Sequence, residues 1–189
     1  MPLPIKDKTP LEGETGFSLI ELLITLIVLA IVVSLAAPSF REWRERIEAL
    51  RVKSILFSAL KQAKSQSYGT QNDVLFCLSD GAGRCHRNSN KKLLLFVDRN
   101  SNKHFDSHID HLILNENTHL RYGALSLGAG SRRHYAKFYS DTGRPRGHMG
   151  HIKYCPNSGD TKNMFQVSFN KFGIIKYKPN AIHRTGCSR

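Results

Sequence analysis

One acidic residue, Glu21, interrupts an otherwise uncharged apolar run that extends from Phe17 to Ala37. At about 1.5 Å of rise per residue, a helix over this run would measure roughly 30 Å, enough to cross the core of a bilayer. A carboxylate inside such a helix costs about 2.5 to 3.5 kcal/mol near the bilayer centre, so we expect it to have a partner. The simpler alternative is a signal-anchor that tolerates one acid. Glu21 is the most informative residue of the chain.

The only plausible cleavage site near the N-terminus of this chain precedes the apolar run, whereas a conventional secretory signal is cleaved after its apolar stretch. Gly16 is followed directly by Phe17, Glu21 lies close behind, and Pro38 follows the run. This arrangement resembles the prepilin signature of the type IV pilin and type II secretion pseudopilin superfamily. The resemblance implies cleavage after Gly16 by a prepilin peptidase and N-methylation of Phe17. It also implies that Glu21 pairs with a terminal amine during filament assembly.

The chain of 189 residues divides by composition into four segments. We expect a leader at 1–16, a transmembrane helix at 17–37, an amphipathic extension of that helix at 38–68 and a head domain at 69–189. Pro38 should kink the helix without ending it, because the apolar pattern resumes at once. The residues expected to form the packing face of the extension are Phe40, Trp43, Ile47, Leu50, Phe57, Leu60 and Ala63.

After Gly69 the sequence changes to short apolar or alternating runs separated by turn-rich segments, which predicts antiparallel strands. The stretch 123–131 is the most linker-like and is expected to be a mobile loop. The fold class that follows is α+β and pilin-like, a long N-terminal helix packed on an antiparallel sheet. The expected strands are 74–78, 93–97, 112–114, 120–122, 135–139, 152–155, 165–169 and 174–177.

All four cysteines, Cys77, Cys85, Cys155 and Cys187, fall in the part expected to lie outside the cytoplasm. An even number there indicates disulfides, for which three pairings exist. We favour Cys77 with Cys85 and Cys155 with Cys187, because each pair joins a strand end to a nearby loop or tail. The competing interpretation is a zinc site, but Cys-x-x-Cys spacing does not occur. We expect no metal and no cofactor.

Oxygen-bearing side chains occur at alternate positions of 98–106, as they do in calcium loops. An EF-hand loop needs Gly where Lys103 stands and a bidentate Glu where Ile109 stands. A solvated turn is the preferred interpretation, with calcium as the alternative. The sequence contains no Gly-x-Ser-x-Gly, His-Glu-x-x-His or phosphate-binding glycine loop, so we do not expect an enzyme.

Within the superfamily, the region after Gly69 resembles the GspH and FimT group of minor pilins and pseudopilins, which includes FimU. The similarity lies in 74–77 followed by Cys85, in the strand end at 96–100 and in the turn at 138–143. It implies a subunit that starts or caps a filament beside other minor pilins and a major pilin or pseudopilins. It also implies a single-pass inner-membrane protein with a periplasmic head. FimT-like members bind DNA through a Gly-Arg-x-Arg motif, which 143–146 matches.

The charge of the chain, +13 overall, is concentrated near its C-terminus. Residues 131–189 contain 12 Lys and Arg against only Asp141 and Asp160. Such asymmetry is expected of a polyanion binder, although a solvated surface or attraction to anionic lipid also fits. The candidate DNA-binding residues are Arg144, Arg146, Arg132, Arg133, Lys137 and Lys153. The rings placed to stack on exposed bases are His134, Tyr135, Tyr139, His148, Tyr154 and Tyr177.

The function predicted from the sequence is that of a FimT-like minor type IV pilin that takes part in pilus assembly and binds DNA for natural transformation. The alternative is a GspH-type minor pseudopilin of a type II secretion system, whose head contacts other minor subunits. A third reading is an unrelated signal-anchored periplasmic binding domain.

Overall fold

The computed structural model describes residues 17–187, without the side chains of 35–38. The expected leader, and Gly16 with it, lies outside the described residues. The chain divides into two compact units, Met1–Arg41 and Glu42–Arg189. We call the second the head unit. Every buried apolar residue of the described chain belongs to it, so the head unit has a complete core of its own.

Helix α1 spans Leu19–Thr70 and therefore continues past Pro38, as expected. Within the described residues, no single helix is both long and apolar enough to cross a membrane. The bent pair Leu19–Ser34 and Ser39–Thr70 satisfies length and composition only when its two parts are taken together. The transmembrane segment at 17–37 stays a prediction.

Inside the head unit, α1 buries one face in the core. The apolar residues of this face are Ala49, Val52, Leu56, Ala59, Leu60 and Ala63. The packing face expected from the sequence is wrong in its first half, because Trp43, Ile47 and Leu50 are about half exposed. The buried face instead continues through two acids, Glu45 and Glu48, which a search for apolar spacing passes over.

The first sheet is built around β1. Strand β3 pairs with one edge of β1, while β6 and the short β2 share the other edge, and β4 pairs with β3. All pairs are antiparallel. The strands are β1 (Val74–Ser79), β2 (Cys85–His86), β3 (Lys92–Val97), β4 (His111–Asn117) and β6 (Tyr135–Phe138).

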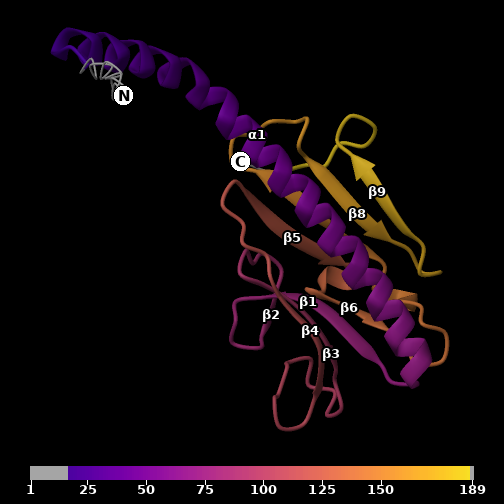
Figure 1. Ribbon diagram of the computed structural model, residues 1–189. Coiled ribbons are helices and arrows are strands. Elements are labelled where there is room, and N and C mark those ends of the chain that lie inside the picture. Colours follow the sequence, from indigo (N-terminus) through magenta and orange to yellow (C-terminus); the bar gives the residue numbers. More distant parts are fainter. Residues whose placement is uncertain (1–16, 188–189) are drawn as a thin grey trace, which may run out of the picture. The chain divides into compact units, whose positions relative to one another are not determined.

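The second sheet has the order β5-β7-β8-β9 and is also antiparallel throughout. Figure 1 shows α1 of the head unit lying along both sheets, and one cluster of buried residues joins the helix to them. The predicted α+β fold, a long helix on antiparallel sheets, is confirmed. The strands of this sheet are β5 (Gly123–Ala129), β7 (Gly150–Pro156), β8 (Phe165–Phe169) and β9 (Ile175–Pro179).

Two sequence expectations about the region before β6 are wrong. Residues 123–131 were expected to form a mobile loop, but most of them form β5, in which buried and half-buried residues alternate. Small residues there permit close packing: a Cβ on Gly123 would lie 2.5 Å from the ring of Tyr154. Conversely, 120–122 is not a strand, because the amides of Arg121 and Tyr122 turn toward the buried Glu48, at 2.7 and 3.1 Å from its carboxylate oxygens.

Candidate nucleic-acid interface and filament anchor

The N-terminal site predicted from the sequence lies where α1 begins. Leu22 donates the first backbone hydrogen bond to Ser18, at 3.1 Å, and Glu21 occupies the first turn of the helix, where its side chain is exposed. A carboxylate in this position is favoured by the helix dipole. It also stands one turn from the amine that cleavage before Phe17 would create.

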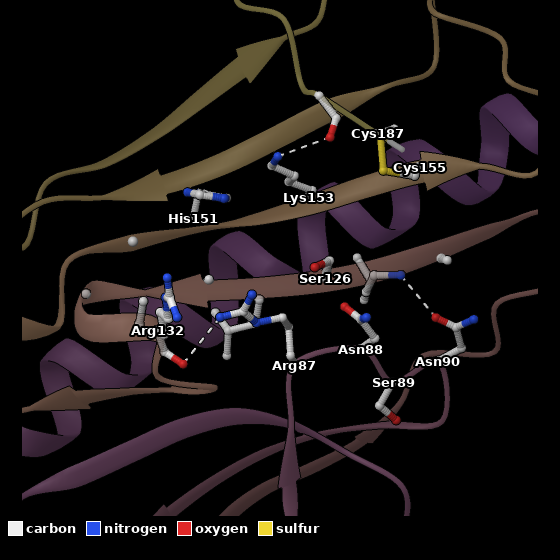
Figure 2. Close-up of a pocket in the computed structure, with 18 of the residues that line it drawn as sticks. Arg87, Asn88, Ser89, Asn90, Ser126, Arg132, His151, Lys153, Cys155 and Cys187 are labelled. Atoms are coloured by element: carbon white, nitrogen blue, oxygen red, sulfur yellow. Dashed lines mark hydrogen bonds between the residues drawn. A yellow bond between two sulfur atoms is a disulfide. The ribbon is translucent and has the colours of Figure 1, made fainter. Parts of the chain in front are cut away.

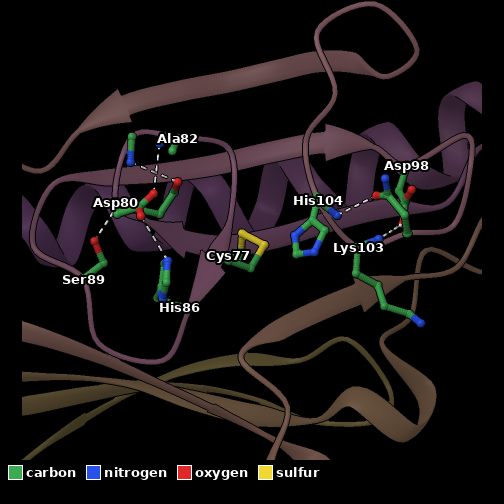
Figure 3. Close-up of a disulfide and its surroundings, with 12 residues drawn as sticks. Cys77, Asp80, Ala82, His86, Ser89, Asp98, Lys103 and His104 are labelled. Atoms are coloured by element: carbon green, nitrogen blue, oxygen red, sulfur yellow. Dashed lines mark hydrogen bonds and ion pairs between the residues drawn. A yellow bond between two sulfur atoms is a disulfide. The ribbon is translucent and has the colours of Figure 1, made fainter.

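Both disulfides of the favoured pairing are present. Cys77–Cys85 joins β1 to β2 (Figure 3), and Cys155–Cys187 joins β7 to the C-terminal tail (Figure 2). The second disulfide holds the tail against the second sheet.

The Gly-Arg-Pro-Arg segment forms a turn after β6, and Gly143 is required there for structural reasons. Its φ is +61°, and a Cβ at this position would lie 2.8 Å from the carbonyl oxygen of Lys64 in α1. The amide of Gly143 donates to the carbonyl of Tyr139 at 2.8 Å. The glycine of the motif therefore lets the turn pack against the helix.

The two arginines of this turn differ in their surroundings. Arg146 forms an ion pair with Asp141 and lies over the ring of Tyr139, 5.1 Å from its centroid. Arg144 is exposed, and with Lys61 on α1 it lines a cavity of about 550 Å³. Part of the charge of the motif is thus already neutralised within the chain.

Two further candidates near the turn, Lys137 and Arg133, also have partners within the chain. Lys137 lies 2.7 Å from Asp73, whose other oxygen accepts a hydrogen bond of 2.9 Å from the amide of Ser140. Partial burial raises the pKa of Asp73, but these two partners outweigh it and hold the pKa below its usual value. Arg133 donates to the carbonyl of Gly147 at 3.2 Å.

The remaining candidates, Arg132 and Lys153, lie on another surface. Both line a cavity of about 880 Å³ on the outer face of the second sheet (Figure 2). The structure therefore divides the six predicted residues between two surfaces. It also adds Arg87 to the second one, because Arg87 donates to the carbonyl of Arg132 at 3.3 Å. Nothing in the sequence pattern pointed to Arg87, which precedes the basic region.

Two of the rings expected to stack on bases are not accessible. Tyr154 is fully buried, and His148 is 5% exposed. Burial, followed by the charges of Arg133 and Lys137, lowers the pKa of His148 to about 4. His148 packs against the rings of Tyr135 and Tyr139, with centroids 5.4 and 6.0 Å away. These two buried rings belong to the core of the head unit and not to its surface.

In the loop at 98–106, which the sequence analysis weighed as a calcium site, Asp98 and Asp106 accept hydrogen bonds from other residues of the same loop. Asp106 accepts from the side-chain amides of Asn100 and Asn102, at 2.9 and 2.6 Å. Asp98 accepts from the backbone amide of Lys103 at 3.0 Å (Figure 3). Within the part of the chain that the structure describes, no group of three or more His, Cys, Asp or Glu is placed to hold a metal ion.

Comparison with known families finds one match, the prokaryotic N-terminal methylation motif, over residues 13–37. This motif, on a long helix that packs on antiparallel sheets, defines a pilin-like structural subunit and not an enzyme. Residues 13–37 thus carry the N-terminal motif that the sequence comparison with type IV pilins and type II secretion pseudopilins predicts. It implies a membrane-anchored N-terminal helix, processing by a prepilin peptidase and assembly with other pilins.

Two solved structures are similar to the chain in fold. The type IV minor pilin FimU of Pseudomonas aeruginosa is 16% identical, with a TM-score of 0.47, over 75% of this chain and 94% of that one. The minor pseudopilin EpsH from the type 2 secretion system of Vibrio cholerae is 11% identical, with a TM-score of 0.47, over 69% of this chain and 94% of that one. No match was found among curated proteins.

Proposed function

We propose that the chain is a FimT-like minor pilin, which is incorporated into a type IV pilus and binds DNA through its head unit during natural transformation. Its anchor would lie in the inner membrane and its head in the periplasm. The observation that supports DNA binding is the charge of residues 131–189, 12 Lys and Arg against two Asp. Asp141, one of these two acids, is ion-paired with Arg146. The two acids together offset only two of the twelve positive charges, so a large positive excess remains.

The decisive experiment measures binding of a short fluorescein-labelled DNA duplex to the oxidised head unit by fluorescence anisotropy over a salt series. With four to six phosphates neutralised, log K against log salt should fall with a slope of about −0.9 per contact. A head unit that shows no binding at physiological salt would overturn the proposal.

The Gly-Arg-Pro-Arg turn is tested separately with Arg144→Gln/Arg146→Gln. If both arginines contact phosphates, the slope flattens by about two and DNA uptake by cells falls. Lys103→Gln, at an exposed position that does not line the cavity beside Arg144, serves as the control and should change the slope less. Because both arginines are exposed, the double variant should keep the fold.

The second candidate function is that of a GspH-type minor pseudopilin, since the methylation motif is shared by pilins and pseudopilins. In that case the head would contact other minor subunits and not DNA. A null result in the anisotropy experiment, together with loss of protein secretion on deletion of the gene, would favour this candidate.

A further inference from the structure

The outer face of the second sheet carries two adjoining cavities, of about 880 and 660 Å³. They share a wall formed by residues of β7 and the tail. We call the combined surface the basic groove. Its lining comes from 87–90, from residues of β5, β7, β8 and β9, from the tail at 183–187, and from five residues beside the strands, Gly130, Arg132, Met149, Asn170 and Ile174. Figure 2 shows Arg87, Arg132, His151 and Lys153 around the first cavity.

The strand register places the polar side chains of the basic groove in rows. Lys153 on β7 is paired with Gln166 on β8, which is paired with Lys178 on β9. His151 is linked in the same way through Ser168 to Lys176. Because neighbouring strands lie about 4.8 Å apart, the two positions that end each row lie about 10 Å apart across the sheet.

The lining of the basic groove is cationic without internal neutralisation. It contains no Asp or Glu among the described residues. Lys153 donates to the carbonyl of Gly186 at 3.3 Å, so its partner is neutral, and the partner of Arg87 is a carbonyl as well. This differs from the surface around the Gly-Arg-Pro-Arg turn at 143–146, where Arg146 and Lys137 are ion-paired. The Lys and Arg residues of the lining are Arg87, Arg132, Lys153, Lys176, Lys178 and Arg184.

The two rims of the basic groove are fixed by contacts to the sheet. On one side, the amide of Leu127 in β5 donates to the carbonyl of Arg87 at 2.8 Å. On the other side, Cys155–Cys187 and a hydrogen bond of 2.8 Å from the amide of Thr185 to Asn180 hold the tail. The tail brings His183 and Arg184 to the second cavity. The side chain of Thr185 is buried there, and its hydroxyl has no partner among the described residues.

We propose that this basic groove, completed by the disulfide-held tail, is the main phosphate-binding surface of the head unit and takes the backbone of duplex DNA. The proposal rests on the DNA-binding function proposed above. Duplex is favoured because the one Phe, Tyr or Trp in the described lining, Phe169, is buried, so no such ring is available for an unstacked base. Contacts to phosphates alone give binding that does not depend on base sequence.

The proposal is tested by comparing two variants of equal charge in the oxidised head unit, with the labelled duplex as probe. Lys176→Gln/Lys178→Gln changes only groove residues, whereas Lys61→Gln/Lys103→Gln removes two exposed lysines that lie outside both cavities. The groove variant should weaken binding more than the control and flatten the slope of log K against log salt by about two. Circular dichroism and thermal unfolding check that both variants remain folded.

The contribution of the tail is tested with Cys155→Ser/Cys187→Ser and Arg184→Gln, alone and together. Releasing the tail should weaken DNA binding, and adding Arg184→Gln to the released tail should have little further effect. Cys77→Ser/Cys85→Ser, which leaves the tail in place, is the matched control. If the parent binds DNA but the groove variant binds equally well, the basic groove is not the site, although the proposed function survives. If the parent does not bind, both proposals fail.

Discussion

The hydroxyl of Tyr154 in β7 donates a hydrogen bond of 3.0 Å to the carboxylate of Glu48 in α1. Both residues are buried, and Glu48 also accepts from the amides of Arg121 and Tyr122. Burial, together with the negative charge of Glu48, raises the pKa of Tyr154 above its usual value, so the hydroxyl stays protonated and remains a donor. One acid thus joins the helix, a loop and the second sheet.

Loss of the hydrogen bonds made by Glu48 should destabilise the head unit strongly. Tyr154→Phe loses one hydrogen bond to a charged group and should lower the free energy of unfolding by about 1.5 to 3 kcal/mol. Glu48→Ala leaves three donors without their acceptor, one of them the buried hydroxyl of Tyr154, and should cost about 3 kcal/mol. Urea unfolding of the head unit measures both. Glu42→Ala, at an exposed position of the same helix, should change stability by less than about 0.5 kcal/mol. Equal effects of the two glutamate variants would contradict the structure.

Acid should destabilise the head unit through His148, whose pKa in the folded state is about 4. Unfolding exposes this imidazole, whose pKa then returns to about 6.5, so the unfolded state binds more protons between these values. Stability should therefore fall as the pH decreases from 6.5, by about 2 kcal/mol at pH 5. His148→Gln should flatten this dependence in unfolding experiments, whereas His134→Gln, at an exposed position, should not. Some slope should remain, because the pKa of His151 is lowered too.

The two disulfides should differ in their contribution to stability. Cys155–Cys187 spans 32 residues and Cys77–Cys85 spans 8. Since a longer closed loop restricts the unfolded chain more, Cys155→Ser/Cys187→Ser should lower the free energy of unfolding by about 3.7 kcal/mol and Cys77→Ser/Cys85→Ser by about 2.5 kcal/mol. Guanidinium unfolding under oxidising conditions gives both values. The reverse order would show that native-state contacts outweigh loop closure.

DNA binding at the basic groove should strengthen at lower pH. Burial, followed by the charges of Lys153, Lys178, His183 and Arg87, lowers the pKa of His151 in the free protein. A phosphate beside the ring would raise that pKa, so binding takes up a proton, and affinity should rise as the pH falls, by at most tenfold per unit for one proton. Anisotropy titrations between pH 7.5 and pH 5.5 test this. The pH dependence should decrease in His151→Gln and stay unchanged in His134→Gln.

The precursor should be cut between Gly16 and Phe17, and Glu21 should be needed for assembly. Mass spectrometry of the membrane form should show an N-methylated Phe17; an intact segment 1–16 in cells with active prepilin peptidase would refute this prediction. Glu21→Ala should insert into the membrane and remain absent from sheared filaments, because the amine of Phe17 would lose its carboxylate partner. Glu42→Ala should assemble normally.

The fold was predictable where periodicity is strong, and less so where packing decides. The switch from helical spacing to short alternating runs after Gly69 correctly predicts a long helix followed by antiparallel strands. Periodicity does not identify β5, because Gly, Ala and Ser are weak signals of a strand, yet Gly123 is what allows the strand to pack beside Tyr154. Periodicity also misses the first half of the packing face of α1, since the burial of Glu48 there depends on donors 73 to 106 residues away in sequence.

From the sequence, only the amino-acid composition of the candidate site could be predicted, and not which residues form it. The number of Lys and Arg after residue 131 indicates a basic head, but whether each charge is available depends on neighbours that the chain brings together by folding. Asp141 neutralises Arg146, and Asp73 neutralises Lys137. The groove residues come from several strands and a tail, so no continuous motif identifies them.

Helix α1 has a second apolar stripe within the head unit, made by Trp43, Ile47 and Leu50, which are 48 to 56% exposed. At about 100° per residue, this stripe lies on the opposite side of the helix from the buried face that contains Glu48. Because the hydrogen bonds of Glu48 prevent the helix from turning about its own axis, the angle between the stripe and the sheets is fixed. A subunit that packs on this stripe would therefore determine how the head unit is rotated about the axis of α1. It would thereby determine the direction in which the outer face of the second sheet points.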